Sequence, residues 1–434
     1  MASNRTKVNP ALVRRWNTAR VFHALRDVGV ASHGELVATT GLDPATVTAV
    51  LHQLRADGWV RVAEGDEAGA TPSRPGAVGR TGRPPVRLVL DEGAGVLVGA
   101  RLEPGTVRLV ATTIGGLPRA TWQGPADADP DGALGALETG VDALLSDLGA
   151  TRSAVRALGV GVPGLVARDG RVVFGPNLGW RDVPLRARLV ATWSVPVVVD
   201  NDTKAAALAE RLFGAAREAR DFVLVAGHSG IGGAVHLDGR LVRGAGGFAG
   251  ELGHVTVEEG GRLCGCGDRG CLEAYLSERA IEAQLRERGV VVAGYEGAAA
   301  LAGAGDATVL AVLDGAGARL GRALADAVDL LDPECIVLAG SLAHVAPYLT
   351  RAVERALAQP KLARHRGPCP VVVSPLGPDA VPLGGVALAM DLLVAAPDAW
   401  TPPAAVLAGA PTGDLGAPTR DVGAPTRDVG DASG

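Results

Sequence analysis

Apolar residues recur every three or four positions along the first sixty residues, and this spacing predicts three helices. The first helix should end near Gly29. Ser32 and Glu35, three positions apart, form a capping box that predicts a second helix ending at Gly41. The apolar stripe of the first helix consists of Leu12, Trp16, Ala19, Phe22 and Leu25.

A third helix and two strands follow in the same stretch. Asp43 is a good N-cap, Pro44 suits the first helical position, and Gly58 ends the helix. Residues 59–62 and 86–90 alternate between apolar and polar side chains, like the two strands of a hairpin. The buried stripe of the third helix consists of Val47, Val50, Leu51 and Leu54.

Three helices and a hairpin predict a winged helix-turn-helix over residues 1–64 and 86–90. In that arrangement the third helix enters the major groove of double-stranded operator DNA. A small three-helix protein-binding domain would show the same pattern. In the DNA-binding interpretation, the side chains near base edges would be Thr46, Thr48, His52 and Gln53, with Arg55 closer to phosphate.

The two predicted strands are separated by a wing and linker, residues 65–85, rich in Gly, Ala, Pro and Arg. Within it, Arg80 to Pro85 resembles the Gly-Arg-Pro core of arms that enter the minor groove of DNA. Arginine in a narrow minor groove reads its shape and potential, so Arg80 and Arg83 are candidate DNA contacts. An ordinary flexible wing has the same composition.

Beyond residue 90, apolar strand-like runs alternate with Ala-rich helical stretches, which is typical of an α/β fold. Residues 159–164 match the pattern G-x-G-x-x-G of dinucleotide-binding proteins. In those proteins a helix begins at this point, whereas Pro163 and Gly164 here lead into a predicted hairpin. We therefore reject a nicotinamide site.

Length and charge indicate a DNA-binding head on a larger body. The chain has 434 residues, enough for two or three domains. Residues 1–90 carry 12 basic and 7 acidic side chains, whereas the rest carries 30 basic and 40 acidic, so only the head suits a polyanion. We find no signal peptide and no membrane-length apolar run, and expect a cytoplasmic protein. The repetitive tail, residues 401–434, has too little apolar surface to fold.

His254 and a nearby group of cysteines have the composition of a metal site. Cys264, Cys266 and Cys271 lie within eight residues, and His254 precedes them closely. Three thiols and one imidazole complete the ligand set of a closed structural zinc site in a loop over residues 254–271. A thioredoxin-like site is excluded because the Cys-x-x-Cys spacing is missing, and unliganded cysteines are the remaining alternative.

Three further motifs accompany these ligands. The cysteine string continues to Glu273 in the pattern CxCGxxGCxE, and it is preceded by the segment Gly250-Glu251-Leu252-Gly253-His254. Earlier in the chain, the pair Asn201-Asp202 comes directly before an Ala-rich helix. These motifs resemble the ROK family of sugar kinases and sugar-responsive repressors. The resemblance covers residues from about 93 to 395 and implies a two-lobed actin-like, ribonuclease-H-like domain, here within residues 91–400. The N-terminal helices and the Gly-Arg-Pro linker are similar to those of the family's repressors.

By this resemblance, six residues would bind the hydroxyls of a sugar. His254 would use one ring nitrogen for zinc and the other for the sugar. The alternative for Glu251 and Glu273 is helix capping or support of the zinc ligands. The six residues are Asn177, Asn201, Asp202, Glu251, His254 and Glu273.

The family's kinases use the equivalent of Asp202 as a general base and bind ATP through two glycine-rich segments. The second segment, residues 229–233, is kept here, but the first departs from the kinase sequence at Arg101, Glu103 and Pro104. Asp202 would then be a vestigial general base, and the protein would not be an enzyme. The resulting prediction is a repressor, a homodimer or homotetramer, whose operator affinity a sugar shifts. The alternatives are an active sugar kinase with a DNA-binding appendage, and a zinc-containing interaction protein without a small ligand.

Overall fold

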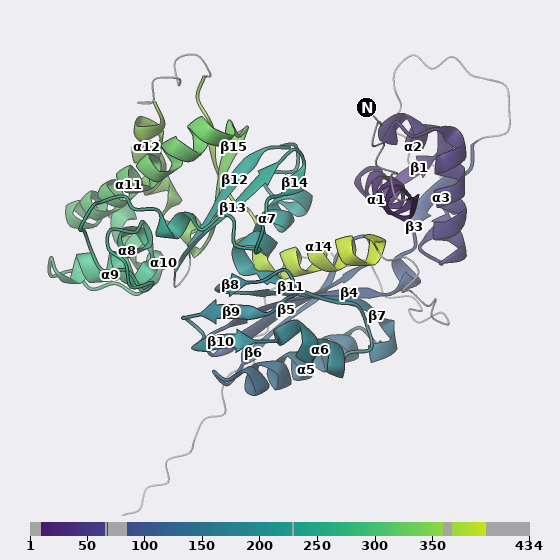
Figure 1. The fold of residues 1–434 in the computed structure, drawn as a ribbon, viewed down its shortest axis with the longest axis horizontal. Coiled ribbons are helices and arrows are strands. Elements are labelled where there is room, and N and C mark those ends of the chain that lie inside the picture. Colours follow the sequence, from purple (N-terminus) through teal and green to yellow (C-terminus); the bar gives the residue numbers. More distant parts are fainter. Residues whose placement is uncertain (1–9, 66, 68–84, 228–229, 359–366, 396–434) are drawn as a thin grey trace, which may run out of the picture.

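The computed structural model describes residues 10–65, 67, 85–227, 230–358 and 367–395. The predictions for Arg80, Arg83 and the tail 401–434 therefore lie outside the described residues. Figure 1 shows a helical head and two sheet-containing lobes, with helix α14 (Ala380–Ala395) lying between the two lobes and ending near the head. The predicted α/β architecture is confirmed.

The head contains the three predicted helices, and their capping interactions form as expected. Ser32 Oγ accepts a hydrogen bond from the Glu35 amide at 3.3 Å while Glu35 Oε2 accepts from the Ser32 amide at 2.7 Å. Asp43 Oδ1 caps the third helix by accepting from the Thr46 amide at 2.9 Å. The elements are α1 (Pro10–Val28), β1 (Val30–Ser32), α2 (His33–Thr40), α3 (Pro44–Ala56), β2 (Val60–Val62) and β3 (Arg87–Leu90).

The predicted hairpin is part of a larger sheet. Strands β2 and β3 pair antiparallel as expected, but β1 pairs with the other edge of β3, so the sheet has three strands in the order β1-β3-β2. Sequence reasoning missed β1 because its three residues carry no alternation of their own. β3 supplies the hydrogen bonds that define it.

The first lobe is a five-stranded sheet in the order β11-β7-β4-β5-β6. Helices α5 and α6 cover one face, and α14 crosses the other (Figure 1). A small antiparallel sheet, β10-β9-β8, lies beside it. The elements are η1 (Glu92–Ala94), β4 (Val96–Glu103), β5 (Thr106–Thr113), β6 (Pro118–Pro125), α5 (Pro130–Asp147), η2 (Arg152–Ala154), β7 (Val155–Val162), β8 (Leu165–Val166), β9 (Val172–Gly175), β10 (Trp180–Val183), α6 (Leu185–Thr192) and β11 (Val197–Asn201).

The second lobe is a five-stranded sheet in the order β14-β13-β12-β15-β16. Helix α7 packs on one face and also against α14, and the other helices form a core on the opposite face. The elements are α7 (Asp202–Phe213), β12 (Phe222–Gly227), β13 (Ile231–Leu237), β14 (Arg240–Leu241), η3 (Leu252–His254), α8 (Glu273–Leu276), α9 (Glu278–Arg286), α10 (Gly294–Gly303), α11 (Ala307–Leu331), β15 (Cys335–Gly340), η4 (Ser341–His344), α12 (Ala346–Leu357), β16 (Val371–Val373), η5 (Gly377–Asp379) and α14 (Ala380–Ala395).

Close backbone approach explains the glycine pattern that suggested a nucleotide site. A Cβ at Gly159 would lie 1.9 Å from the carbonyl oxygen of Gly385, so the glycine allows α14 to pack directly on β7. Gly164 has φ +115° and turns the chain into β8, not into a helix. The rejection of a dinucleotide site therefore agrees with the local structure.

Helix α14 connects the head to the first lobe through one continuous apolar core. Val386, Met390 and Leu393 pack in the same cluster as Phe22 of α1 and Leu97 of β4. Contrary to the expectation that no apolar run reaches membrane length, the segment Gly377–Ala395 is long and apolar enough to cross a membrane by composition. It is 72% buried within the protein, however, as is usual for a core helix. The head and body are thus joined by packing as well as by the chain.

Candidate ligand cleft, metal centre and DNA-binding helix

A cleft of about 550 Å³ is lined by residues of both lobes. Its walls come from the ends of β4, β7 and β11, the start of α7, the turn before β10, the start of β13, and the segments around η3 and α8. All six residues predicted to bind a sugar line this cleft: Asn177, Asn201, Asp202, Glu251, His254 and Glu273.

Asn201 and Asp202 reach the cleft from the junction of β11 and α7. Asn201 caps α7, because its Oδ1 accepts from the Lys204 amide at 3.1 Å, and its Nδ2 donates to the Gly164 carbonyl at 3.0 Å. Asp202 is only 9% exposed, and its Oδ1 accepts from the Thr203 amide at 2.8 Å. Asp202 Oδ2 forms no hydrogen bond with the residues described, so it remains available to a ligand.

Glu273 and Asn177 meet at Gly230. Glu273 Oε2 accepts from the Ile231 amide at 2.9 Å. A Cβ at Gly230 would lie 2.5 Å from that oxygen and 3.6 Å from Asn177 Nδ2, so a side chain there would displace the carboxylate. Arg279 also lines the cleft and donates from Nη2 to Asn177 Oδ1 at 3.3 Å. Sequence reasoning missed Arg279, which belongs to no recognised motif.

A buried lysine supports the loop that carries Glu251. Lys204 is 1% exposed, and its Nζ donates to the Gly247 carbonyl at 2.7 Å. Burial lowers the pKa of Lys204, with Asp200 acting in the opposite direction. Burial raises the pKa of Glu251, and the ammonium of Lys204 partly offsets that rise. The sequence analysis did not identify Lys204 as a residue of the site. The only feature of the sequence that points to it is its position two residues after Asp202.

The residues that depart from the kinase sequence lie in the same cleft. Arg101, Glu103 and Pro104 all line it. Arg101 is 5% exposed, and its Nη2 lies 2.7 Å from Glu103 Oε1. Burial raises the pKa of Glu103, and Arg101 opposes that rise. The carboxylate of Glu103 is therefore paired with the guanidinium of Arg101 within the wall of the cleft.

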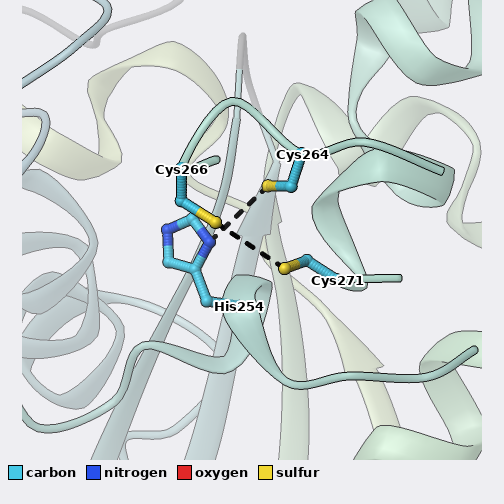
Figure 2. A group of neighbouring side chains, drawn as sticks. All are labelled: His254, Cys264, Cys266 and Cys271. Atoms are coloured by element: carbon cyan, nitrogen blue, oxygen red, sulfur yellow. Dashed lines mark hydrogen bonds between the residues drawn. The ribbon is translucent and has the colours of Figure 1, made fainter. Parts of the chain in front are cut away.

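The four predicted metal ligands form a compact group (Figure 2). The ligand atoms of His254, Cys264, Cys266 and Cys271 lie within 4.8 Å of one another. Cys266 Sγ is 3.7 Å from Cys271 Sγ, and Cys264 Sγ is 3.8 Å from His254 Nδ1. In a tetrahedron, zinc–sulfur bonds of about 2.3 Å place two sulfurs about 3.8 Å apart, and with a zinc–nitrogen bond of about 2.0 Å a sulfur and a nitrogen lie about 3.5 Å apart. Both observed separations are close to these values.

Two of the three thiols, those of Cys264 and Cys271, are buried, whereas Cys266 is exposed. Burial raises the pKa of Cys264 to about 12 and also raises that of Cys271. A zinc ion would hold both as thiolates and displace their protons. Because His254 turns Nδ1 toward Cys264, its Nε2 is left for the cleft that His254 also lines. Cys335 and Cys369 are also buried and do not belong to this group.

Helix α3 presents the residues predicted to contact DNA, but several already have partners. The Thr46 hydroxyl donates to Asp43 Oδ2 at 2.5 Å, and Gln53 Nε2 donates to Asp57 Oδ1 at 2.8 Å. The Thr48 hydroxyl donates to the Pro44 carbonyl at 2.9 Å and lies 3.0 Å from His33 Nε2. His52 and Arg55 are exposed and form no hydrogen bond or ion pair within the described part of the chain. These two are the best placed to reach DNA.

Comparison with known proteins places this arrangement in context. The sequence model described as "ROK family" matches residues 130–391. The chain is 27% identical to the xylose repressor of Bacillus subtilis (strain 168) over 362 residues, 83% of this chain and 91% of the repressor. It is 32% identical to a glucokinase of Halalkalibacterium halodurans over 308 residues, 66% of this chain and 93% of that enzyme.

Solved structures show the same relationship. A ROK family transcriptional regulator, described as a homolog of the E. coli MLC protein, superimposes with a TM-score of 0.75 at 26% identity. That match covers 88% of this chain and 97% of the regulator. The similarity to the regulator therefore extends over most of both chains, whereas the glucokinase corresponds to about two thirds of this one.

Proposed function

The chain belongs to the ROK family, and we propose that it is a sugar-responsive transcriptional regulator that acts as a repressor. The observation that carries this proposal is the position of α14. This helix packs against α7, whose first residue lines the cleft, and it shares an apolar core with the DNA-binding head. A ligand in the cleft is thus connected to the head by directly packed elements.

The cleft has the chemistry of a sugar site. Sugar hydroxyls both donate and accept hydrogen bonds, and carboxylates and amides converging in a concave site bind them in a defined orientation. We assign this role to Asn177, Asn201, Asp202, Glu251, Glu273 and the Nε2 atom of His254. The volume of about 550 Å³ lies within the range of small-molecule sites.

We further propose that the Cys₃His group holds a structural zinc ion. His254, Cys264, Cys266 and Cys271 would bind it, and the ion would fix the loop between η3 and α8. That loop ends next to Glu273, so zinc would hold the carboxylate in place for the sugar. The support is the ligand set and its tetrahedral separations.

We propose the following domain organisation for the chain. Residues 1–64 and 86–90 form the DNA-binding head, and 65–85 its wing and linker. Residues 91–400 bind the sugar, and 401–434 form a low-complexity tail. The head would bind double-stranded operator DNA through α3, as a homodimer or homotetramer in the cytoplasm.

Signal transmission requires that the sugar favour one arrangement of the two lobes over another. If the sugar binds the closed cleft more tightly, closure moves α7 and α14 together with the head that packs on them. The two heads of an oligomer then lose the spacing that paired half-sites require. The sugar would thus lower operator affinity by its differential affinity for the closed state.

A second function, sugar phosphorylation, is favoured by the match to a glucokinase and by Asp202 in the cleft. Three features argue against it. The Arg101–Glu103 pair occupies the cleft wall, Pro104 lacks an amide donor, and the Ile231 amide of the second glycine segment already donates to Glu273. We therefore propose that the chain is not a kinase and that Asp202 binds sugar only.

A thermal-shift screen of the full-length, zinc-loaded protein tests this function. The probes are neutral sugars, sugar phosphates and Mg-ATP, and duplexes selected from a random DNA pool then report operator affinity. We expect one sugar class to raise the melting temperature and to release DNA, with no shift by ATP. Phosphate transfer from ATP to that sugar would establish the kinase instead, and a protein that no sugar stabilises would contradict the sensor.

A further inference from the structure

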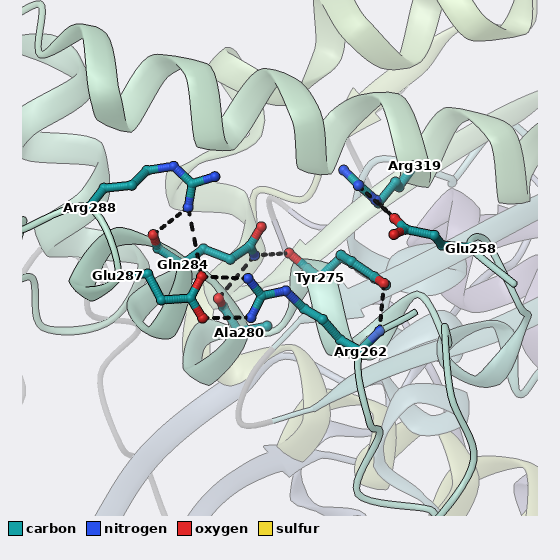
Figure 3. Close-up of polar contacts among 8 residues, drawn as sticks. All are labelled: Glu258, Arg262, Tyr275, Ala280, Gln284, Glu287, Arg288 and Arg319. Carbon is teal, nitrogen blue, oxygen red and sulfur yellow. Dashed lines mark hydrogen bonds and ion pairs between the residues drawn. The ribbon is translucent and has the colours of Figure 1, made fainter. Parts of the chain in front are cut away.

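A second cavity, of about 520 Å³, is lined in part by the loop that carries the four predicted metal ligands, residues 254–271, called the metal loop below. None of its lining residues lines the sugar cleft. It is bounded by the metal loop, α8, α9 and α11 (Figure 3). Nothing in the function proposed above uses it.

Three guanidinium groups line this cavity and outnumber the nearby carboxylates. Arg262 donates to both oxygens of Glu287, at 2.9 and 2.6 Å. Arg319 donates to Glu258 Oε2 at 3.2 and 2.7 Å. Arg288 donates from Nη1 to the Gln284 carbonyl at 2.6 Å, and its closest carboxylate oxygen, on Glu287, is 4.0 Å away. One positive charge is therefore left over among these five side chains.

The floor of the cavity consists of buried polar side chains held in fixed positions. Tyr275 is 3% exposed, its hydroxyl accepts from the Arg262 amide at 2.8 Å, and the Arg319 guanidinium lies 4.5 Å from its ring centroid. Gln284 Nε2 donates to the Tyr275 carbonyl at 2.9 Å and to the Ala280 carbonyl at 3.0 Å. Figure 3 shows Tyr275 lying between the side chains of Arg288 and Arg319.

We propose that this cavity is a second ligand site, specific for a small oxyanion of the phosphate or carboxylate class. Guanidinium groups bind both through paired, charge-assisted hydrogen bonds. Arg288 has donors to spare. The pairs of Arg262 with Glu287 and Arg319 with Glu258 are partly exposed, so each contributes little to stability and can be rearranged by a competing anion.

The position of Tyr275 connects this site to the sugar cleft. Helix α8 has a single turn, in which Glu273 faces the cleft and Tyr275 faces the cavity. Arg262 is also only two residues from the metal ligand Cys264. An anion that shifts Arg262 or Tyr275 therefore acts on the turn that holds Glu273, and sugar and anion affinities must change reciprocally. This coupling, unlike the site itself, rests on the proposed function.

The test is a calorimetric titration of the full-length, zinc-loaded protein with inorganic phosphate and, separately, with citrate, at constant ionic strength in chloride. We expect saturable binding of at least one of them. R288A should weaken it about tenfold or more, because a hydrogen bond to a charged group contributes about 1.5–3 kcal/mol. The matched control is R286A, an exposed arginine at the end of α9, two residues before Arg288, that does not line the cavity.

Hydrogen exchange provides the second measurement. Binding of the anion should change the protection of the Ile231 amide, which donates to Glu273. D202N, altered in the sugar cleft, should bind the anion like the wild type, so failure of the sugar proposal leaves this result unaffected. Absence of saturable binding by phosphate and citrate, or equal losses in R288A and R286A, would overturn the second site. Binding without any change at Ile231 would overturn the coupling.

Discussion

The guanidinium of Arg240, on β14 of the second lobe, lies 5.6 Å from the ring centroid of Trp16, on α1 of the head. Trp16 is 51% exposed, so this contact is a small bridge on the outside of the junction between head and body. His23 and Asp391, 3.5 Å apart, form a second contact between α1 and α14. Helix α1 therefore contacts both β14 and α14.

Removing the Trp16–Arg240 contact should weaken communication between sugar and DNA. A cation–π contact at an exposed site contributes about 0.5–1 kcal/mol, so W16A should reduce the sugar-induced change in operator affinity about two- to fivefold. R240A should have the same effect, and the double variant should show no further loss. R351A, on α12 of the same lobe, is the control. Fluorescence anisotropy with and without sugar measures all four, and an unchanged response in W16A would exclude this route.

Replacing Asp202 by Asn should separate sugar binding from DNA binding. The substitution keeps the shape of the side chain but removes the charge from the available Oδ2, and hydrogen bonds to charged groups contribute about 1.5–3 kcal/mol. We expect sugar affinity to fall about tenfold or more, with operator affinity in the absence of sugar unchanged. Calorimetry and anisotropy provide the two measurements. A D202N protein with normal sugar affinity would remove Asp202 from the site.

Zinc should be required for the sugar response because the metal loop ends beside Glu273. C266S leaves one ligand position without a thiolate, so we expect less than the wild-type content of about one zinc per chain and no thermal shift with sugar. C335A, in the buried strand β15, is the matched control and should keep both properties. Elemental analysis and thermal melts measure the outcome. A normal sugar shift in zinc-free C266S protein would contradict the structural role.

Arg55 should contribute to DNA affinity without contributing to sequence preference. Its side chain is exposed on α3 and has no partner among the described residues. If it contacts a phosphate, R55A should weaken binding to all duplexes and reduce the slope of log K against log salt by about 0.9. H52A should instead change the preferred sequence. A salt slope identical to that of the wild type would place Arg55 outside the interface.

The stability of the folded chain should depend on the charge of Glu251. Because burial raises its pKa in the folded state, its stabilising contribution is present below the ordinary pKa of a carboxyl group and is lost as pH rises through the raised value. E251Q should flatten the fall of stability that the wild type shows as pH rises from about 4.3, the ordinary pKa of a glutamate, toward neutrality. Urea melts across that range, with exposed Glu259 changed to Gln as control, measure it. A slope equal to that of the control would contradict the assignment.

Local signals made part of the structure predictable. The caps at Ser32 and Asp43 are interactions within a few residues, so the starts of α2 and α3 follow from sequence. The ligand group and the cleft residues follow from motifs whose members are close in the chain. In contrast, Arg279 and Asn177 form a hydrogen bond although they are 102 positions apart in the sequence, and Lys204 and Gly247 do so at a separation of 43 positions. Only the folded arrangement of the lobes brings such pairs together.

The place of α14 at the far end of the described chain has a consequence for biosynthesis. The head is synthesised before α14, but Val386, Met390 and Leu393 complete its core with residues made nearly 300 positions later. Domains made early usually fold before the remainder is synthesised. Here a nascent head exposes apolar surface until α14 arrives, so a truncated or stalled chain presents an incomplete DNA-binding domain. We therefore expect that a chain must be synthesised through α14 before it can occupy an operator.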